Sequence, residues 1–406
     1  KSGPHHSLRN TKFMKKYISL FIPALLLYSA AQAQQDINSV LKSIESRNKT
    51  LQAESRLHET RQLEAHTGNY LANPTVELNQ LWADRSAGGN VNELAVVQGF
   101  DFPTVYTNKH KLADLKATTS GYQYAVSRQQ ILLSAQQLCL EVIYLHKQKK
   151  LAEERAGNAQ HLFELYQKRL EQGDANQLEL NKIQLERLNT RNALRLNQIA
   201  IDAALEQLQN LNGGEAVGFR AGEYPEMPVL PTYPQLESEY LASDPGLKDM
   251  SGQSEIAERE IRLTRAMTLP KFDIGYRRNG GSGESMNGFR VGMSIPLWEN
   301  KNTVKKAKAQ FEYTTAMMED KLQSLKSNLK QLYQQVQTLS ESREEYRKIL
   351  SGQQSIALLN KALDAGQISM IEYFTEVTTF YESRQNYLDV ERDYFNALAQ
   401  LFQYKL

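Results

Sequence analysis

The segment at residues 269–298 reads LPKFDIGYRRNGGSGESMNGFRVGMSIPLW, and its pattern decides the fold. Apolar side chains alternate with polar ones on both sides of a Gly-rich centre, which is typical of two strands that each have one apolar face. The strands are predicted over about 271–278 and 288–297, with a polar loop between them. Each is roughly 9 to 10 residues long, the length that a tilted strand needs to cross a bilayer. A water-soluble hairpin packed on helices is the alternative.

An earlier segment repeats this pattern, with strands predicted over about 75–83 and 93–102. Prolines bracket both hairpins at matching distances, since Pro74 precedes Pro270 by 196 residues and Pro103 precedes Pro296 by 193. This spacing predicts an internal two-fold repeat of one supersecondary unit. The expected divisions are a first repeat over 34–212, a Pro/Gly linker over 213–234 and a second repeat over 235–406.

Long helices are predicted outside the hairpins. Two stretches of over 100 residues lack proline. A proline in a helix interior would destabilise the helix by about 3 kcal/mol, so its absence favours long helices. Leu322, Leu325, Leu329 and Leu332 step by three and four residues, a coiled-coil spacing that an ordinary amphipathic bundle helix also shows. A helix from about 104 to 172 would span roughly 100 Å, so we expect it to extend into an aqueous compartment.

The composition excludes several classes of protein. A mean hydropathy of −0.55 is too low for a transporter made of many apolar helices. The single cysteine, Cys139, excludes a disulfide framework and a thiolate zinc site, and we expect it to be a buried small hydrophobe. The formal net charge is only +2 and no basic run is interleaved with aromatic residues, so nucleic acid is not an expected partner.

Residues 1–33 have the features of an upstream extension followed by a cleaved signal peptide. A basic start at Met14 precedes an apolar stretch over 17–28, and Ala31-Gln32-Ala33 fits a signal-peptidase site. Without residues 1–33 the chain has 43 basic and 46 acidic residues, a formal charge of −3. The residue directly after the predicted cleavage site is Gln34 and not a cysteine, so a lipid-modified amino terminus is not expected.

Four strands per chain cannot close a transmembrane barrel, and open sheet edges are not viable in lipid. If the strands enter a membrane, several chains must share one barrel, and three chains give twelve strands. The expected fold is therefore mainly α with β. We expect a membrane-anchored tube, with long coiled-coil helical hairpins that form a helical barrel beneath strands shared by several chains.

The chain resembles the TolC-like outer-membrane efflux proteins of Gram-negative tripartite pumps over essentially all of 36–406. Short motifs in a duplicated order carry the resemblance: LANPTVEL at 71–78, QGFDFP at 98–103, LPKFDIG at 269–275, GMSIPLW at 292–298 and AGQIS at 365–369. The Asn-Pro before the first strand and the Phe-x-Pro after the second are most similar to the branch associated with heavy-metal cation efflux.

The resemblance implies a passive duct without cofactors. It implies a homotrimer in the outer membrane, in which four strands per chain contribute to a trimeric 12-stranded transmembrane β-barrel and the long helical hairpins form a large periplasmic α-barrel. The implied partners are a periplasmic adaptor protein, an inner-membrane transporter and outer-membrane lipid, and the implied cargo is metal cations or small toxic compounds. Two alternatives stay open, namely the same duct serving type I protein secretion and a secreted coiled-coil scaffold with soluble hairpins. No nucleophile elbow, phosphate loop or paired-carboxylate signature indicates an enzyme.

The family places its adaptor-contacting tips and its periplasmic gate at the turns of the long helical hairpins, here at Gly173 and Gly366. Glycine suits a turn that needs a left-handed residue. Glu179 and Glu372 each lie six residues beyond a glycine, so a trimer would place six carboxylates near a constriction, as in cation-selective channels. Ordinary solvated helix residues are the alternative. The other expected tip residues are Asp174, Gln367 and Glu376.

One departure weakens the expected acidic ring, because an acidic position of the family one turn after Glu372 falls here on Thr375. Aromatic residues near the predicted strand ends are expected to form interfacial girdles, with core packing as the alternative. They are Trp82, Tyr106, Tyr276 and Trp298. The histidines after the predicted leader have no i, i+4 spacing and no cysteine partner, so no metal site is expected.

Overall fold

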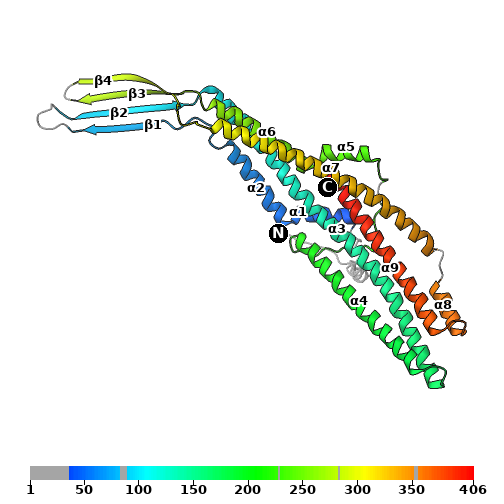
Figure 1. Ribbon diagram of the computed structural model, residues 1–406. Coiled ribbons are helices and arrows are strands. Elements are labelled where there is room, and N and C mark those ends of the chain that lie inside the picture. Colours follow the sequence, from blue (N-terminus) through cyan, green and yellow to red (C-terminus); the bar gives the residue numbers. More distant parts are fainter. Residues whose placement is uncertain (1–35, 83–88, 227–228, 282–283, 352–354) are drawn as a thin grey trace, which may run out of the picture.

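The computed structural model describes residues 36–82, 89–226, 229–281, 284–351 and 355–406. The leader predicted at 1–33 lies outside these residues, as do the centres of both hairpin loops. Four strands extend from one end of a long helical bundle (Figure 1), which confirms the prediction of a mainly helical fold with antiparallel strands. No helix in the described ranges is both long and apolar enough to cross a membrane.

The helices and strands follow one another along the whole described chain. They are α1 (Ile37–Arg47), α2 (Lys49–His66), β1 (Thr75–Leu81), β2 (Val91–Phe100), α3 (Pro103–Gln172), α4 (Gln177–Leu211), α5 (Tyr233–Ser243), α6 (Pro245–Ala266), β3 (Lys271–Gly281), β4 (Glu284–Ser294), α7 (Thr303–Ser351), α8 (Ser355–Asp364), α9 (Met370–Leu401) and the 3-10 turn η1 (Gln403–Lys405).

The four strands form one antiparallel sheet in the order β1-β2-β3-β4. β2 and β3 pair although four helices separate them in the chain, and their register places Val96 opposite Tyr276. β4 begins at Glu284, earlier than the predicted position 288, because its ladder with β3 continues to the pair Gly281 and Glu284. β4 ends before Pro296, which has no N–H to extend a ladder.

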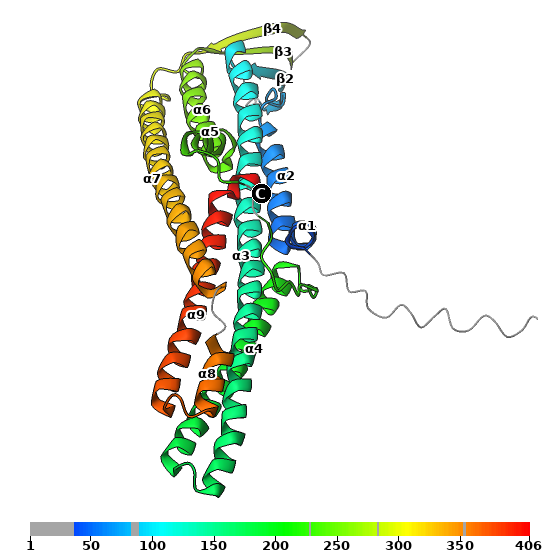
Figure 2. The same cartoon turned by 90° about the vertical axis from the view of Figure 1, so that its right-hand side faces the viewer.

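The long helices run side by side away from the sheet (Figures 1 and 2). α3 has 70 residues and so spans about 105 Å. It contacts α2, α4, α6 and α9, while α7 contacts α6 and α9. This arrangement leaves α4 and the α7–α8 segment at opposite edges of a layer whose centre is α3 and α9.

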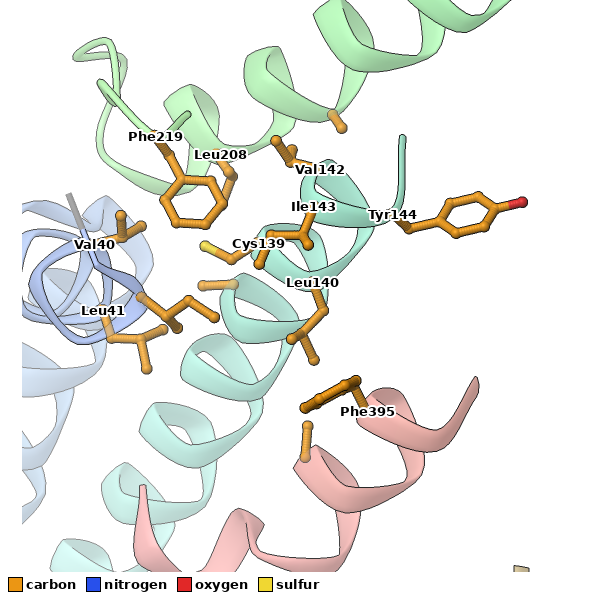
Figure 3. Close-up of a cluster of buried hydrophobic side chains, with 14 of the residues drawn as sticks. Val40, Leu41, Cys139, Leu140, Val142, Ile143, Tyr144, Leu208, Phe219 and Phe395 are labelled. Carbon is orange, nitrogen blue, oxygen red and sulfur yellow. The ribbon is translucent and has the colours of Figure 1, made fainter. Parts of the chain in front are cut away.

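The main core lies midway along α3, where α1, α4 and α9 meet it (Figure 3). Cys139 is fully buried there, as predicted, and burial raises the pKa of its thiol to about 12. Phe219, from the predicted linker, is 1% exposed and packs into the same core. The first part of that linker is thus a packed segment, also held by an ion pair of 2.8 Å between Lys147 and Glu223.

A glycine sets how closely α6 approaches α3. A Cβ on Gly252 would lie 2.4 Å from the hydroxyl oxygen of Thr119, and both residues are buried. Gly157, also inside a helix, has no such neighbour within 4 Å. Glycine in a helix interior usually lowers stability, by about 0.5–1 kcal/mol relative to alanine. The close crossing therefore explains Gly252 but not Gly157.

We expect Gly252→Ala to lower the free energy of unfolding by about 1–3 kcal/mol, because the new methyl group overpacks the α3–α6 crossing. The control Gly157→Ala should raise it by about 0.5–1 kcal/mol through helix propensity. Denaturant titration followed by circular dichroism measures both. Adding Thr119→Ala to Gly252→Ala should recover most of the loss, and equal effects at the two glycines would contradict this account of the crossing.

Candidate functional site

The two helical hairpins end in turns of the same geometry, at the end of the bundle farthest from the sheet (Figure 1). Gly173 has a φ of 81° and Gly366 a φ of 68°, both in the left-handed region. The next residues, Asp174 and Gln367, each donate their N–H back across the turn at 2.8 Å. These bonds are those of a Schellman motif, which closes a helix end.

Both glutamates at the tips belong to capping boxes at the starts of α4 and α9. The Asn176 side chain accepts the Glu179 N–H at 2.9 Å, and the Glu179 carboxylate accepts the Asn176 N–H at 2.9 Å. Ser369 and Glu372 make the same exchange at 3.2 and 2.8 Å. This capping role was not predicted from the sequence, although Asn or Ser followed three residues later by Glu is its signature.

The capping box favours the ionised form of the Glu372 carboxylate. Its carboxylate is exposed, and the hydrogen bond from the Ser369 N–H holds the pKa of Glu372 below its ordinary value. The positive end of the α9 dipole also favours a negative charge at this position. At neutral pH Glu372 is therefore an anion held in one place at the tip.

Polar contacts connect the two tips to each other. The Arg169 guanidinium lies 3.9 Å from an Asp364 carboxylate oxygen and donates to the Asp364 carbonyl at 3.4 Å. Behind them the buried Tyr373 hydroxyl accepts from Asn158 at 2.8 Å and donates to Asn360 at 2.6 Å. An apolar cluster of α3, α4, α8 and α9 surrounds these bonds, so the two turns form one packed unit.

The remaining predicted tip residues are solvent-facing. Asp174, Gln367 and Glu376 are exposed, and Glu179 is half-buried. Among the residues that the structure describes, no group of three or more His, Cys, Asp or Glu side chains is arranged to hold a metal ion. One chain therefore supplies separate carboxylates, and a ring of them requires further copies.

One face of the sheet is mostly apolar. Strand register places most of the apolar side chains on it, with Val76 (61%) and Phe289 (89%) among those strongly exposed, while Leu81, Val91, Ala95, Val97 and Met286 lie on the other face. The apolar members of the mostly apolar face are Val76, Leu78, Leu94, Val96, Phe100, Phe272, Ile274, Tyr276, Phe289, Val291 and Met293, and Gln98 and Arg278 share the face. Eleven apolar side chains on one face of a single sheet, most of them exposed in the single chain, indicate a surface that contacts lipid or protein.

The opposite face carries ion pairs that connect neighbouring strands. The Arg290 guanidinium lies 3.3 Å from the Asp273 carboxylate, and Arg277 pairs with Glu93. Gly292 stands directly opposite Asp273, and a Cβ there would lie 2.1 Å from the Asp273 carboxylate. The missing side chain therefore lets the charged groups lie along the wall of the sheet.

The predicted interfacial aromatics take three kinds of position. Trp82 follows β1 and Trp298 follows β4, so they lie at opposite ends of the sheet, 78% and 81% exposed. Tyr276 lies within the apolar face, beside Phe289 at a ring distance of 6.3 Å. Tyr106 is half-buried in the first turn of α3, where its hydroxyl accepts the Asp101 N–H at 2.9 Å.

Comparison with known proteins confirms the resemblance to efflux proteins that the motifs indicated. Residues 236–404 match the family model of outer membrane efflux proteins. The chain is 26% identical over 181 residues to the pyoverdine export outer membrane protein OpmQ of Pseudomonas aeruginosa, and the match spans 44% of this chain but only 38% of OpmQ.

Solved structures share the fold. The chain is similar to CusC with a TM-score of 0.78 at 15% identity, over 93% of this chain and 95% of that one. The CmeC outer membrane channel of Campylobacter jejuni matches with a TM-score of 0.71 at 12% identity, over 91% and 85% of the two chains. At these identities the likeness concerns the fold.

We expect the stabilising effect of Glu372 to depend on pH. Its pKa is lowered in the folded chain from the ordinary value of about 4.5, so its ionised form stabilises the fold fully above that pH, and the stabilisation is lost as the pH falls through the lowered pKa. Thermal unfolding should show wild type above Glu372→Gln at pH 7, with the difference vanishing in acid. A difference that grows in acid would contradict the cap.

Ser369→Ala checks the same capping box from its other side. Loss of the cap should destabilise the chain by about 1 kcal/mol at neutral pH. Ser324→Ala, at an exposed position inside α7, is the matched control and should change stability by less than about 0.5 kcal/mol.

Proposed function

We propose that the chain is one subunit of a homotrimeric outer-membrane duct that passively conducts small substrates to the exterior. The observation that carries this proposal is the sheet, which has one exposed apolar face and, in the described order, β1 and β4 as edges. Unpaired backbone groups are not tolerated in lipid. Three copies joined β1 to β4 would remove every edge and give a barrel of twelve strands.

The proposed subunit contains an internal two-fold repeat. The first repeat spans 34–212 and the second spans 235–406, with the linker 213–234 between them. In support, each part contains two antiparallel strands followed by long helices that turn at a left-handed glycine and restart at a capping box. The apolar faces of both hairpins also lie on the same side of the joint sheet.

Contacts between copies are proposed along the helical edges as well. α4 carries a stripe of apolar side chains that are mostly exposed in the single chain: Leu178, Leu185, Leu188, Leu196 and Ile199. Their spacings of three, seven and eight residues keep them close to one side of the helix. α7 and α8, at the other edge, expose Ile349 and Leu358. In a closed ring the α4 stripe of one subunit would meet α7 and α8 of the next.

The helical barrel would lie in the periplasm, reached through the predicted signal peptide and without a lipid anchor. The tips would contact a periplasmic adaptor protein and, through it, an inner-membrane transporter. Glu179 and Glu372, with Asp174 and Glu376 nearby, would form an acidic ring at the gate. The cargo would be metal cations or small compounds. The name of OpmQ as a pyoverdine exporter favours small molecules over polypeptides.

Planar-bilayer recording of the detergent-purified chain tests the duct. We expect discrete, cation-biased channels from a species whose mass corresponds to three copies. A protein that stays in solution as a monomer or coiled-coil dimer without detergent, and that conducts nothing, would contradict the proposal and favour a secreted scaffold.

Glu372→Gln tests the acidic ring. Glutamine also satisfies a capping box, so this change removes the charge and keeps the fold. We expect the cation-to-anion permeability ratio to fall by about two-fold or more, because three charges leave the constriction. Glu312→Gln, on an exposed position near the start of α7, is the control and should leave the ratio unchanged. Unchanged selectivity in Glu372→Gln would remove this residue from the gate.

A further inference from the structure

A cluster of four lysines directly follows the sheet. Lys301, Lys305, Lys306 and Lys308 are all exposed, and 300–311 contains no acidic residue. Among the residues that the structure describes, none of the four ammonium groups lies in an ion pair, and the neighbouring Glu299 pairs with Lys271 instead, at 3.3 Å. The lysine cluster is therefore uncompensated positive charge.

Exposed apolar residues connect the sheet to this cluster. Ile295, Leu297 and Trp298 are 57%, 69% and 81% exposed, and they continue the chain from the end of β4. Within fifteen residues the chain thus passes from the apolar face of the sheet to an exposed tryptophan and then to the lysines. Hydrocarbon, interface and charged headgroups follow one another in the same order across a membrane surface.

The stability of α7 does not explain the lysine cluster. Cations at a helix N-terminus oppose the helix dipole, and no acidic residue occupies the first turn of α7. Within α7, Lys305 and Lys308 are three residues apart, so their like charges repel. The matching place after β2 also carries exposed Lys111, beside Lys109, which pairs with Asp101 at 3.3 Å.

We propose that the lysine cluster binds anionic phospholipid headgroups at the membrane surface where the strands emerge toward the helices. This inference rests on the proposed function, because it requires the sheet to lie in a membrane. Lysines held near a membrane surface attract anionic lipids, and the attraction decreases with the ionic strength. In three copies the cluster would form a basic belt around the duct.

The fluorescence of Trp298 can report which lipids lie next to the lysine cluster. The chain has two tryptophans, so Trp82→Phe leaves Trp298, three residues from the cluster, as the single reporter. The full chain carrying this change is reconstituted into phosphatidylcholine vesicles, and its fluorescence is quenched with dibrominated phosphatidylglycerol or dibrominated phosphatidylcholine. We expect the anionic lipid to reach Trp298 with a preference of about five-fold at low salt, falling toward one at about 0.5 M salt.

Charge removal then tests the cluster itself. Lys301→Gln, Lys305→Gln, Lys306→Gln and Lys308→Gln together should reduce the preference to about one. The matched control changes four exposed lysines elsewhere, Lys150, Lys168, Lys330 and Lys348, to Gln and should keep it. The thermal midpoint of the cluster variant should be equal to or above that of the parent, because the helix dipole is then unopposed.

The outcomes separate this inference from the duct. Equal quenching by both lipids in the parent, or a preference that survives in the cluster variant, would overturn the lipid site while leaving the inserted sheet intact. The second result would assign the anionic lipid to other residues. Absence of quenching by either lipid would mean that Trp298 does not meet a membrane, and the proposed function would fail together with the inference.

Discussion

The edges of the sheet constrain this molecule more than any single contact. β1 and β4 each present a row of backbone N–H and C=O groups that the described chain does not pair, and the adjoining face is apolar and exposed. Water would form hydrogen bonds with the backbone groups of the edges but would leave the apolar face in contact with water. Lipid would cover the apolar face but could not form hydrogen bonds with the edges. Further strands from other copies, in a membrane, would satisfy both the edges and the face. In the proposed trimer, the need to close the barrel thus comes from backbone hydrogen bonding rather than from any specific side chain.

The helices meet a different requirement. A sheet so thin has no core of its own, so its four strands need a support that fixes their register. α3 and α7 continue directly from β2 and β4, and α6 leads into β3. The close crossing at Gly252 holds α6 on α3, and the core around Cys139 and Phe219 holds α1, α4 and α9 on the same helix. The hairpins thus start from fixed positions, which allows β2 to pair with β3 across a long chain separation.

Much of this could be predicted from the sequence because its signals are local. Alternation of apolar residues indicated four strands, and proline-free stretches indicated the long helices. Strand ends were less predictable, since Gly280 and Gly281 resemble a loop in composition but are paired with β4. The burial of Phe219 could not be predicted from the sequence for another reason, because the prolines and glycines around it indicated a linker. Burial there depends on residues far away in the chain, such as Val40 and Leu208.

The tips show how one local pattern can have two meanings. Glu179 and Glu372 were predicted as gate residues because they lie close to the hairpin turns at which the resemblance implies a gate, and in the structure each of them caps a helix. These roles are compatible, because each carboxylate uses one oxygen for the cap and keeps the other free. Both turns are also closed by Schellman bonds and joined through Arg169 and Asp364. Helix ends satisfied in this way resist local unwinding. Any widening of a ring formed by such tips would therefore move the paired helices as units, and the capped glutamates would move with them.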